Sequence, residues 1–450
     1  MTVAARLQRE TFRTSRLLDF CSTRELVKQI GHPVEQWPLV ILKELADNAL
    51  DAAEDAEIAP AIQIGVCNNQ IVVTDNGPGI QPETVADILD FAVRVSSREA
   101  YASPTRGAQG NALKTIVAMA FALDGTVGET TIESQEIAHR ITFRVDQVRQ
   151  EPRLDHFQGR SSVRNGARIT VNWPVYAGSN LDQVKSRFLQ MAEDYGWLNP
   201  HLALSVAWNG ARAVSFEAPA PAWEKWRPCN PTPACWYDAP RLRRLMGAYI
   251  ARDEDRGRPP RTVREFISEF RGLSGSAKQK AVLEEVGAAR MSLPEFFGDG
   301  DCVNHDRISA LLSVMRKHSR AVKPADLGLI GKDHLAARCE ALGVDLNTFK
   351  YNRSLGESDD GIPDVIETAF GWCPDGQNAR RIITGVNWSP AIGNPFRSLG
   401  AYGESLDSIL AHQRSGGDEP IVFVLHLARP RIEYTDHGKT AVAVPGDDNG

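Results

Sequence analysis

Residues 42–56 read LKELADNALDAAEDA, and this stretch decides how the rest of the chain is interpreted. Its polar residues recur at the spacing that places side chains on one face of a helix. They are Glu44, Asp47, Asn48 and Asp51. The other side of the helix is apolar and consists of Ile41, Leu42, Leu45, Ala49 and Ala52. We therefore predict a helix over about 34–56.

A solvated acidic face explains these carboxylates as readily as a binding site does, because surface helices often carry such charges. Asn48 favours a site, since asparagine has poor helix propensity and gains little on a purely structural face. A carboxylate beside a neutral oxygen ligand suits a Mg²⁺ site and a base that activates water.

An alternating segment, IQIGVCNNQIVVTDNGPGI at 62–80, follows this helix. Apolar residues at every second position, interrupted by Asn68-Asn69, predict a β-hairpin. The hairpin leads into Asp75-Asn76-Gly77-Pro78-Gly79, which is either an ordinary turn or an acidic acceptor flanked by glycines. In the second interpretation the carboxylate accepts a hydrogen bond from the exocyclic amine of a flat heterocycle.

A glycine-rich segment, RGAQGNALK at 106–114, precedes an expected helix that ends near residue 123. Glycines before a helix expose backbone N–H groups at its positive end, which favours a phosphate. Neither a P-loop nor the full dinucleotide-binding fingerprint occurs in the chain.

The order and spacing of ELADNALDA, DNGPGI and TRGAQGNALK resemble those of the GHKL (Bergerat-fold) ATPases. Further segments resemble the B subunit of topoisomerase VI, so that the similarity runs from about residue 20 to 445. They are GWLNPH at 196–201, NPTPACWYD at 230–238, TVREFISEFRGLSGSAKQKAV at 262–282, GVNWSPAIGNPFR at 385–397 and YTDHGKTAVAVP at 434–445.

The resemblance implies ATP and Mg²⁺ as cofactors and assigns roles to individual residues. Glu44 would be the general base, and Asn48 would ligate Mg²⁺. Asp75 would bind the adenine amine, with Gly79 giving room and Thr170 on the strand behind. Lys439 would reach the γ-phosphate as a switch lysine from the C-terminal domain. The residues that would wrap the phosphates are Ser97, Arg98, Gly107, Ala108, Gln109, Gly110, Asn111, Ala112, Leu113 and Lys114.

Some positions depart from the family pattern. Ala112 stands where a third glycine is expected, Ala167 where a threonine is expected, and Arg98 where a lysine is expected. Only eleven residues follow Lys439, where the family continues into a long helix that docks the A subunit. We therefore expect either a compact variant or a chain without the usual partner.

The expected fold class is α+β, with three domains. A GHKL ATP-binding α/β sandwich is expected over 1–217, a proline-rich linker and helix-two-turns-helix-like domain over 218–335, and an α/β transducer domain over 336–450. Within the first domain we predict strands near 129–146 and 166–173, an amphipathic helix over 180–196 and a strand–turn–strand over 202–216. Residues 421–428, IVFVLHLA, predict a strand of the third domain.

Composition limits the partners. The 450 residues are 42% apolar and 24% charged with a net charge of −6, so contacts with DNA must come from local basic patches. Candidates in the middle domain are Arg271, Lys278, Lys280, Arg316, Lys317, Arg320 and Lys323, which a solubilising surface explains equally well.

Seven cysteines without a CxxC pair argue against a zinc ribbon or a disulfide scaffold. No apolar run is long enough to span a membrane, and the N-terminal residues lack the apolar core of a secretory signal, so we expect a cytoplasmic, nucleoid-associated protein.

Two functions remain open from the sequence. In the first, the chain is the ATPase subunit of a topoisomerase VI-like enzyme. It would dimerise on ATP around duplex DNA, while a separate A-type subunit cleaves the DNA in a heterotetramer. In the second, it is a stand-alone ATP-dependent DNA clamp for chromosome organisation or defence. A chaperone or kinase on the same fold ranks last, because fold alone does not give function.

Overall fold

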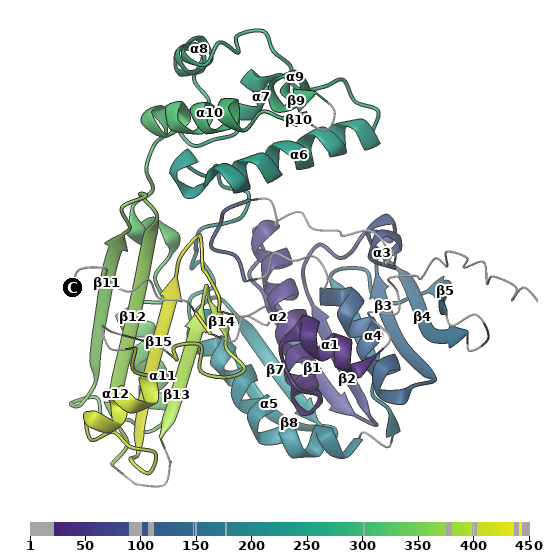
Figure 1. The fold of residues 1–450 in the computed structure, drawn as a ribbon. Coiled ribbons are helices and arrows are strands. Elements are labelled where there is room, and N and C mark those ends of the chain that lie inside the picture. Colours follow the sequence, from purple (N-terminus) through teal and green to yellow (C-terminus); the bar gives the residue numbers. More distant parts are fainter. Residues whose placement is uncertain are drawn as a thin grey trace, which may run out of the picture.

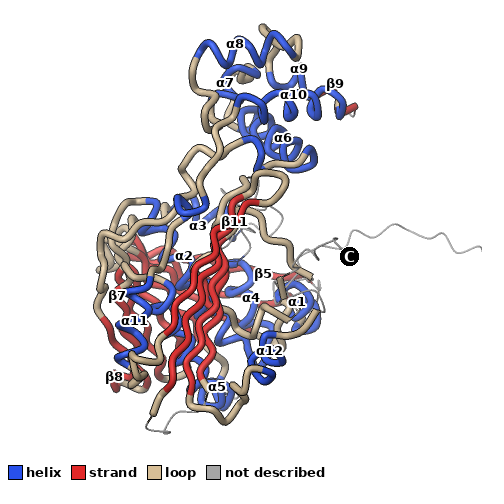
Figure 2. Tube along the Cα trace, turned by 90° about the vertical axis from the view of Figure 1, so that its left-hand side faces the viewer, coloured by secondary structure: helices blue, strands red, loops and turns tan. Residues whose placement is uncertain are grey.

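The computed structural model consists of two β-sheet domains side by side and a helical block that projects at one end (Figures 1 and 2). It describes residues 22–89, 101–106, 112–146, 148, 151–175, 178–299, 302–374, 380–397, 399, 403–435 and 441–442. The predicted α+β class is confirmed.

The first domain is a mixed sheet covered on one face by helices. Among the described residues the sheet has eight strands in the order β5-β4-β3-β6-β2-β1-β7-β8, with only β1 and β7 parallel. The strands are β1 (Ala61–Cys67), β2 (Gln70–Asp75), β3 (Val127–Ser134), β4 (Ile137–Asp146), β5 (Glu151–Arg160), β6 (Ala167–Asn172), β7 (Ala203–Trp208) and β8 (Ala211–Phe216). The helical elements are α1 (Thr23–Ile30), η2 (Val34–Gln36), α2 (Trp37–Asp55), α3 (Pro82–Leu89), α4 (Ala112–Asp124) and α5 (Gly178–Leu198).

Alternation along the strands explains why only one face of this sheet is covered. Inward residues such as Ile64, Val73 and Ile169 join one buried cluster with the apolar sides of α2, α4 and α5. The opposite face carries polar residues, including Thr74 and Arg168. Burying the apolar face of the sheet against the helices is the main stabilisation of this domain.

The tight turns follow the sequence. Asn68-Asn69 and Asn209-Gly210 all have positive φ, as the two central residues of a type I′ hairpin turn require. Asparagine and glycine tolerate this conformation better than other residues. Both predicted hairpins are therefore confirmed, with β7 and β8 forming the second.

The helical block follows the proline-rich stretch. It contains η4 (Ala234–Trp236), α6 (Ala239–Asp255), α7 (Val263–Ser268), α8 (Ser276–Glu285), α9 (Leu293–Phe297), β9 (Gly298–Asp299), β10 (Cys302–Val303), α10 (His305–His318) and η5 (Pro324–Leu327). Capping boxes at Thr262/Glu265 and Ser292/Glu295 start two of its short helices.

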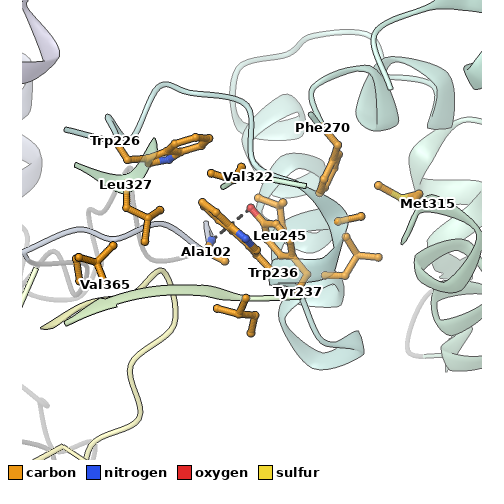
Figure 3. Close-up of a cluster of buried hydrophobic side chains, with 14 of the residues drawn as sticks. Ala102, Trp226, Trp236, Tyr237, Leu245, Phe270, Met315, Val322, Leu327 and Val365 are labelled. Carbon is orange, nitrogen blue, oxygen red and sulfur yellow. Dashed lines mark hydrogen bonds between the residues drawn. The ribbon is translucent and has the colours of Figure 1, made fainter. Parts of the chain in front are cut away.

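One buried core joins this block to the third domain. Figure 3 shows Trp236 and Tyr237 between Leu245 and Phe270 of the helical block and the strand residue Val365. The linker is therefore packed into a core, although its prolines predict an extended chain.

The third domain is a sheet of five strands among the described residues, in the order β11-β12-β15-β13-β14, with only β13 and β15 parallel. Its elements are α11 (Lys332–Ala341), β11 (Lys350–Glu357), β12 (Pro363–Trp372), β13 (Arg381–Val386), β14 (Ser389–Pro390), α12 (Leu406–His412) and β15 (Ile421–Ala428). Its inner face lies against α5, because a Cβ on Gly385 would overlap Leu198 Cδ1.

Several details differ from the sequence prediction. The predicted boundary between 335 and 336 is wrong, because it cuts helix α11. Strand β5 was not predicted, since its residues EPRLDHFQGR show no apolar alternation. The predicted strand at 421–428 is confirmed as β15.

No helix in the described ranges is long and apolar enough to cross a bilayer. The cysteines in those ranges form no disulfide, as their scattered positions predict.

Candidate functional site

One stripe of α2 faces away from the domain core. It consists of Glu44, Asn48 and Ala52, which repeat every fourth residue and so stack on one face. Asn48 is exposed, while Glu44 and Ala52 are half-buried. Glu44 and Asn48 are thus polar residues of α2 that lie on an accessible face.

The predicted single acidic face is wrong for Asp47 and Asp51, which are only 4% and 5% exposed. Side chains from other segments cover this edge of the helix. Tyr195 and Ser389 donate hydrogen bonds to Asp47, and Arg106 donates one to Asp51. Helical spacing could not reveal this difference, because the covering residues are distant in sequence.

The loop after β2 packs against the same part of α2. A Cβ on Gly77 would lie 3.5 Å from the Cβ of Ala52. Ala52 is one helical turn beyond Asn48, about 6 Å along the axis. Asp75, at the start of this loop, therefore lies on the same side of the domain as Asn48.

The carboxylate of Asp75 is held by two backbone groups. Its Oδ1 accepts hydrogen bonds from the N–H of Gly77 (2.8 Å) and of Ala167 (3.2 Å). Burial raises the pKa of Asp75, and these two hydrogen bonds oppose that rise. Among the described residues its other oxygen accepts no hydrogen bond, so it can accept one from an amine.

Two glycines shape the space around Asp75. Gly166 has φ +73°, and a Cβ there would overlap the carbonyl oxygen of Asp75. Gly79 has φ +85°, and its Cβ would lie 2.5 Å from Ser134 Oγ. Ser134 donates a hydrogen bond to the carbonyl of Gly166 and accepts one from the N–H of Ile80. No signal in the sequence pointed to Ser134, because a lone serine at the end of a strand is common.

The prediction that Thr170 lies behind Asp75 is wrong. In the antiparallel pairing of β2 with β6, Thr170 lies opposite Val72 and Arg168 lies opposite Thr74. Asp75 therefore comes next to Ala167, three residues from Thr170. Alternate residues of a strand point to opposite faces, so Thr170 and Ala167 face opposite sides of the sheet. Ala167, where the family pattern places a threonine, is the residue of β6 that contacts Asp75.

Much of the predicted phosphate segment lies outside the described residues. This applies to Ser97, Arg98, Gly107, Ala108, Gln109, Gly110 and Asn111, and also to the predicted switch residue Lys439. Ala112, Leu113 and Lys114 form the first turn of α4. Lys114 is 1% exposed, so its side chain lies within the domain.

Arg106, just before that segment, is held by a buried ionic cluster. Its side chain is fully buried and forms ion pairs with Asp51 (2.8 Å) and Glu54 (2.7 Å) in the last turns of α2. It also donates a hydrogen bond to Asn199. The segment that enters 107–111 is therefore attached to the helix that carries Glu44 and Asn48.

Glu54 is the centre of the cluster. Its carboxylate also contacts Lys225 Nζ (2.8 Å) and His201 Nε2 (2.9 Å). Burial alone would raise the pKa of Glu54, but the charges of Arg106 and Lys225 hold it well below its usual value. Burial lowers the pKa of His201, so the imidazole is neutral and donates to Glu54.

The sequence did not indicate this cluster. Asn199 and His201 belong to GWLNPH, a segment that carries a family resemblance but no chemical pattern that predicts an ionic cluster. Lys225 lies in the proline-rich stretch, where nothing distinguishes it from a surface lysine.

The third domain reaches α2 through the hairpin of β13 and β14. Ser389 donates to both carboxylate oxygens of Asp47, at 2.8 and 2.7 Å. Asn199 donates to the carbonyl of Trp388 (2.9 Å), and Asn387 donates to the carbonyl of Thr105 (3.3 Å). The hairpin therefore contacts the helix, the cluster and the root of the glycine-rich segment.

The residues present fit a nucleotide with Mg²⁺. Asp75 offers a carboxylate oxygen as an acceptor, and Asn48 offers a neutral oxygen one turn from the Glu44 carboxylate. In the described ranges no group of three His, Cys, Asp or Glu could hold a metal ion. Mg²⁺ suits such a site, because it keeps several waters and takes ligands from phosphates.

The basic residues of the middle block have varied surroundings. Arg271 lies over the Trp226 ring, and Arg316 donates to the carbonyl of Tyr237. Lys317 is paired with Glu285, whereas Arg320 and Lys323 are exposed. Lys278 donates to the carbonyl of His318, and Lys280 lies 3.7 Å from Glu284. Acidic neighbours weaken the case for Lys280 and Lys317 as phosphate contacts.

A family model described as histidine kinase-, DNA gyrase B- and HSP90-like ATPase matches residues 34–176. The B subunit of type 2 DNA topoisomerase 6 from Archaeoglobus fulgidus is 22% identical over 428 residues, covering 90% of this chain and 66% of that protein. The protein of the same name from Natronomonas pharaonis is 33% identical over 140 residues, covering 29% of this chain and 17% of that protein. The chain thus spans about two thirds of the length of the Archaeoglobus relative.

Among solved structures, the Aquifex aeolicus MutL ATPase domain complexed with ADP is similar, with 11% identity. The match covers 88% of this chain and 91% of that chain, at a TM-score of 0.34. The N-terminal domain of a DNA repair protein is 12% identical over 93% of this chain and 92% of that chain, at a TM-score of 0.43.

Proposed function

We propose that this chain binds and hydrolyses ATP as the B-type component of a type IIB DNA topoisomerase. Its residues 34–176 match the histidine kinase-, DNA gyrase B- and HSP90-like ATPase family, and the chain resembles the B subunit of topoisomerase 6. Two ATP-bound copies close on duplex DNA in the nucleoid, and a separate A-type subunit cleaves the DNA. The observation that carries this proposal is the convergence of two segments on α2, the helix that carries Glu44 and Asn48: the Asp75 loop lies on Ala52, and Arg106 pairs with Asp51 and Glu54.

Each residue has a separate chemical task in this proposal. Asp75 accepts a hydrogen bond from the adenine amine, since its Oδ1 is already held by backbone N–H groups. Glu44 takes the proton of the attacking water, and Asn48 holds the metal through its side-chain oxygen. Bound Mg²⁺ supplies charge neutralisation at the phosphates.

The glycine-rich segment and Lys439 complete the proposed site. Backbone N–H groups of 107–111 and the start of α4 surround the phosphates. Lys439 reaches the γ-phosphate from the third domain. A contact that only ATP can make gives ATP and ADP different affinities for the closed form, which is what drives closure.

The catalytic step is tested by Glu44→Ala. We expect turnover at least about 100-fold slower, a typical contribution of a general base, with ATP binding retained. Glu83→Ala, an exposed glutamate at the start of α3, is the control and should hydrolyse ATP normally. Equal loss of binding and turnover in Glu44→Ala would show that Glu44 is structural.

The assembly is tested by two measurements. Light scattering of the full chain should detect a dimer with a non-hydrolysable ATP analogue. Relaxation of supercoiled DNA should require an added A-type subunit. Relaxation by this chain alone would refute the division of labour. ATP-dependent DNA binding with no A-type partner would favour a stand-alone clamp.

A further inference from the structure

The turn between β13 and β14 has an unusual conformation. Asn387 and Trp388 have φ of +49° and +61°, as a two-residue hairpin turn requires. Asparagine tolerates this conformation, but it is a genuine outlier for a side chain as bulky as tryptophan. Such strain persists only where surrounding contacts compensate for it, and it is a reason to look for a function.

The contacts that compensate come from both domains. Within the third domain, the N–H of Trp388 donates to His426 Nε2 (3.1 Å), and the N–H of Asn387 donates to the carbonyl of Leu427 (2.8 Å). Trp388 is fully buried and packs edge-on against Trp223. The hairpin is therefore fixed to β15 and moves with the third domain.

The residue after the turn binds the ATPase domain. Ser389 is 4% exposed, and its hydroxyl donates to the Asp47 carboxylate while it accepts a hydrogen bond from Lys43 Nζ. Tyr195 adds a second hydroxyl donor to Asp47 at 2.8 Å. A buried carboxylate with several donors is held firmly, because losing one donor leaves it partly unsatisfied.

Asp47 lies between the two residues that the proposed function needs. It is three residues after Glu44 and immediately precedes Asn48 on the same helix. A rigid helix transmits any displacement at Asp47 to both neighbours.

We propose that Ser389 is a positioning residue: through its hydrogen bonds to Asp47 it fixes α2 against the third domain, so that a shift of the β13–β14 hairpin displaces Glu44 and Asn48. The inference rests on the proposed function, because it concerns the geometry of that nucleotide site. Ser389 is buried and its hydroxyl contacts Asp47 and Lys43, so it acts on the site through α2.

The test uses Ser389→Ala in the full chain. Turnover of ATP should fall at least about 10-fold, since misplacing catalytic groups by about 1 Å costs up to about 100-fold. The dissociation constant for a non-hydrolysable analogue should change less than about 2-fold, because Asp75 and its loop are untouched. The control is Tyr351→Phe, which removes a half-buried hydrogen bond to Glu367 within the third domain alone. It should retain wild-type turnover.

A second readout does not depend on activity. Binding of the non-hydrolysable analogue to wild type should change hydrogen exchange of the amides at 385–390. Ser389→Ala should lose this response, whereas Tyr351→Phe should keep it. Asp47→Ala should lose the same response, and the double variant should be no worse than Asp47→Ala alone, because the effect of Ser389 passes through Asp47.

The outcomes separate the two proposals. Wild-type turnover and an intact exchange response in Ser389→Ala would overturn this inference and leave the ATPase proposal standing. A wild-type chain that neither binds nor hydrolyses ATP would overturn both.

Discussion

Arg106 offers the sharpest test of how the site is held together. Its guanidinium has no exposed surface and forms ion pairs with Asp51 and Glu54 at 2.8 and 2.7 Å. With Lys225 it balances the two carboxylates, because His201 is neutral. Arg106→Ala would leave two buried carboxylates with one cation.

The size of the effect follows from burial. Removing one partner of a buried pair costs about 3–5 kcal/mol, because the remaining charge is uncompensated. For a domain of this size that corresponds to a fall in melting temperature of about 6–20 °C. Arg106→Lys should recover only part of the loss, since an ammonium cannot match the planar fork that reaches Asp51, Glu54 and Asn199 together.

Thermal unfolding of the full chain, followed by calorimetry, is the measurement. The matched control is Arg164→Ala, which removes an ion pair with Glu136 at a similar distance but with 80% of the arginine side chain exposed. Exposed pairs contribute about 0–1 kcal/mol, so this control should barely shift the melting temperature. If Arg106→Ala and Arg164→Ala shifted it equally, the buried cluster would not hold the domain together as we argue.

Two further predictions concern single residues. Burial alone would raise the pKa of Glu367, but His426, whose Nδ1 lies 3.6 Å from Glu367 Oε2, and hydrogen bonds from the backbone N–H groups of Gly331 and Ile330 outweigh it and lower that pKa to about 2. The lowered pKa contributes about 3 kcal/mol to the free energy of unfolding above pH 4.5, and this contribution is lost as the pH falls towards 2. In urea unfolding, the free energy of unfolding of wild type should therefore fall over that pH range by more than that of Glu367→Gln. Gly166→Ala should destabilise the first domain by more than about 1 kcal/mol, because φ is +73° and the Cβ would overlap the Asp75 carbonyl oxygen. Gly210→Ala is the control, because Gly210 has φ +79° but an added Cβ there would have no atom within 4 Å. Thermal unfolding should therefore show a smaller loss of stability for Gly210→Ala, and equal losses in the two variants would contradict the role of the overlap.

The elements that could be predicted from the sequence are those determined by local chemistry. The hairpins around Asn68-Asn69 and Asn209-Gly210 follow from residues that accept positive φ. The helix over 37–55 follows from apolar periodicity that the sheet then buries. Strand β5 was missed because it is an edge strand with few buried residues, and its sequence carries no alternation to detect.

The site was predictable where its residues lie in one short segment. Asp75 and the glycines after it could be assigned together, because a turn fixes their geometry within a few residues. Thr170 was misplaced because β-pairing register decides which face a strand residue occupies, and the sequence alone does not fix register. The ionic cluster could not be predicted at all, since Arg106, Asn199 and Lys225 meet only through tertiary packing.

In the proposed function, the two edges of α2 explain how the first domain and its neighbour respond to one ligand. Glu44 and Asn48 occupy the accessible edge, and Asp47, Asp51 and Glu54 occupy the buried edge. The buried edge is costly unless every carboxylate has partners, and those partners come from the third domain, the linker and the root of the glycine-rich segment. Displacing any one of these segments therefore leaves a buried charge unsatisfied, which resists independent movement of the parts. A ligand that moves the accessible edge of α2 must consequently move its partners as well, and this coupling requires no contact between the nucleotide and the third domain beyond the proposed lysine.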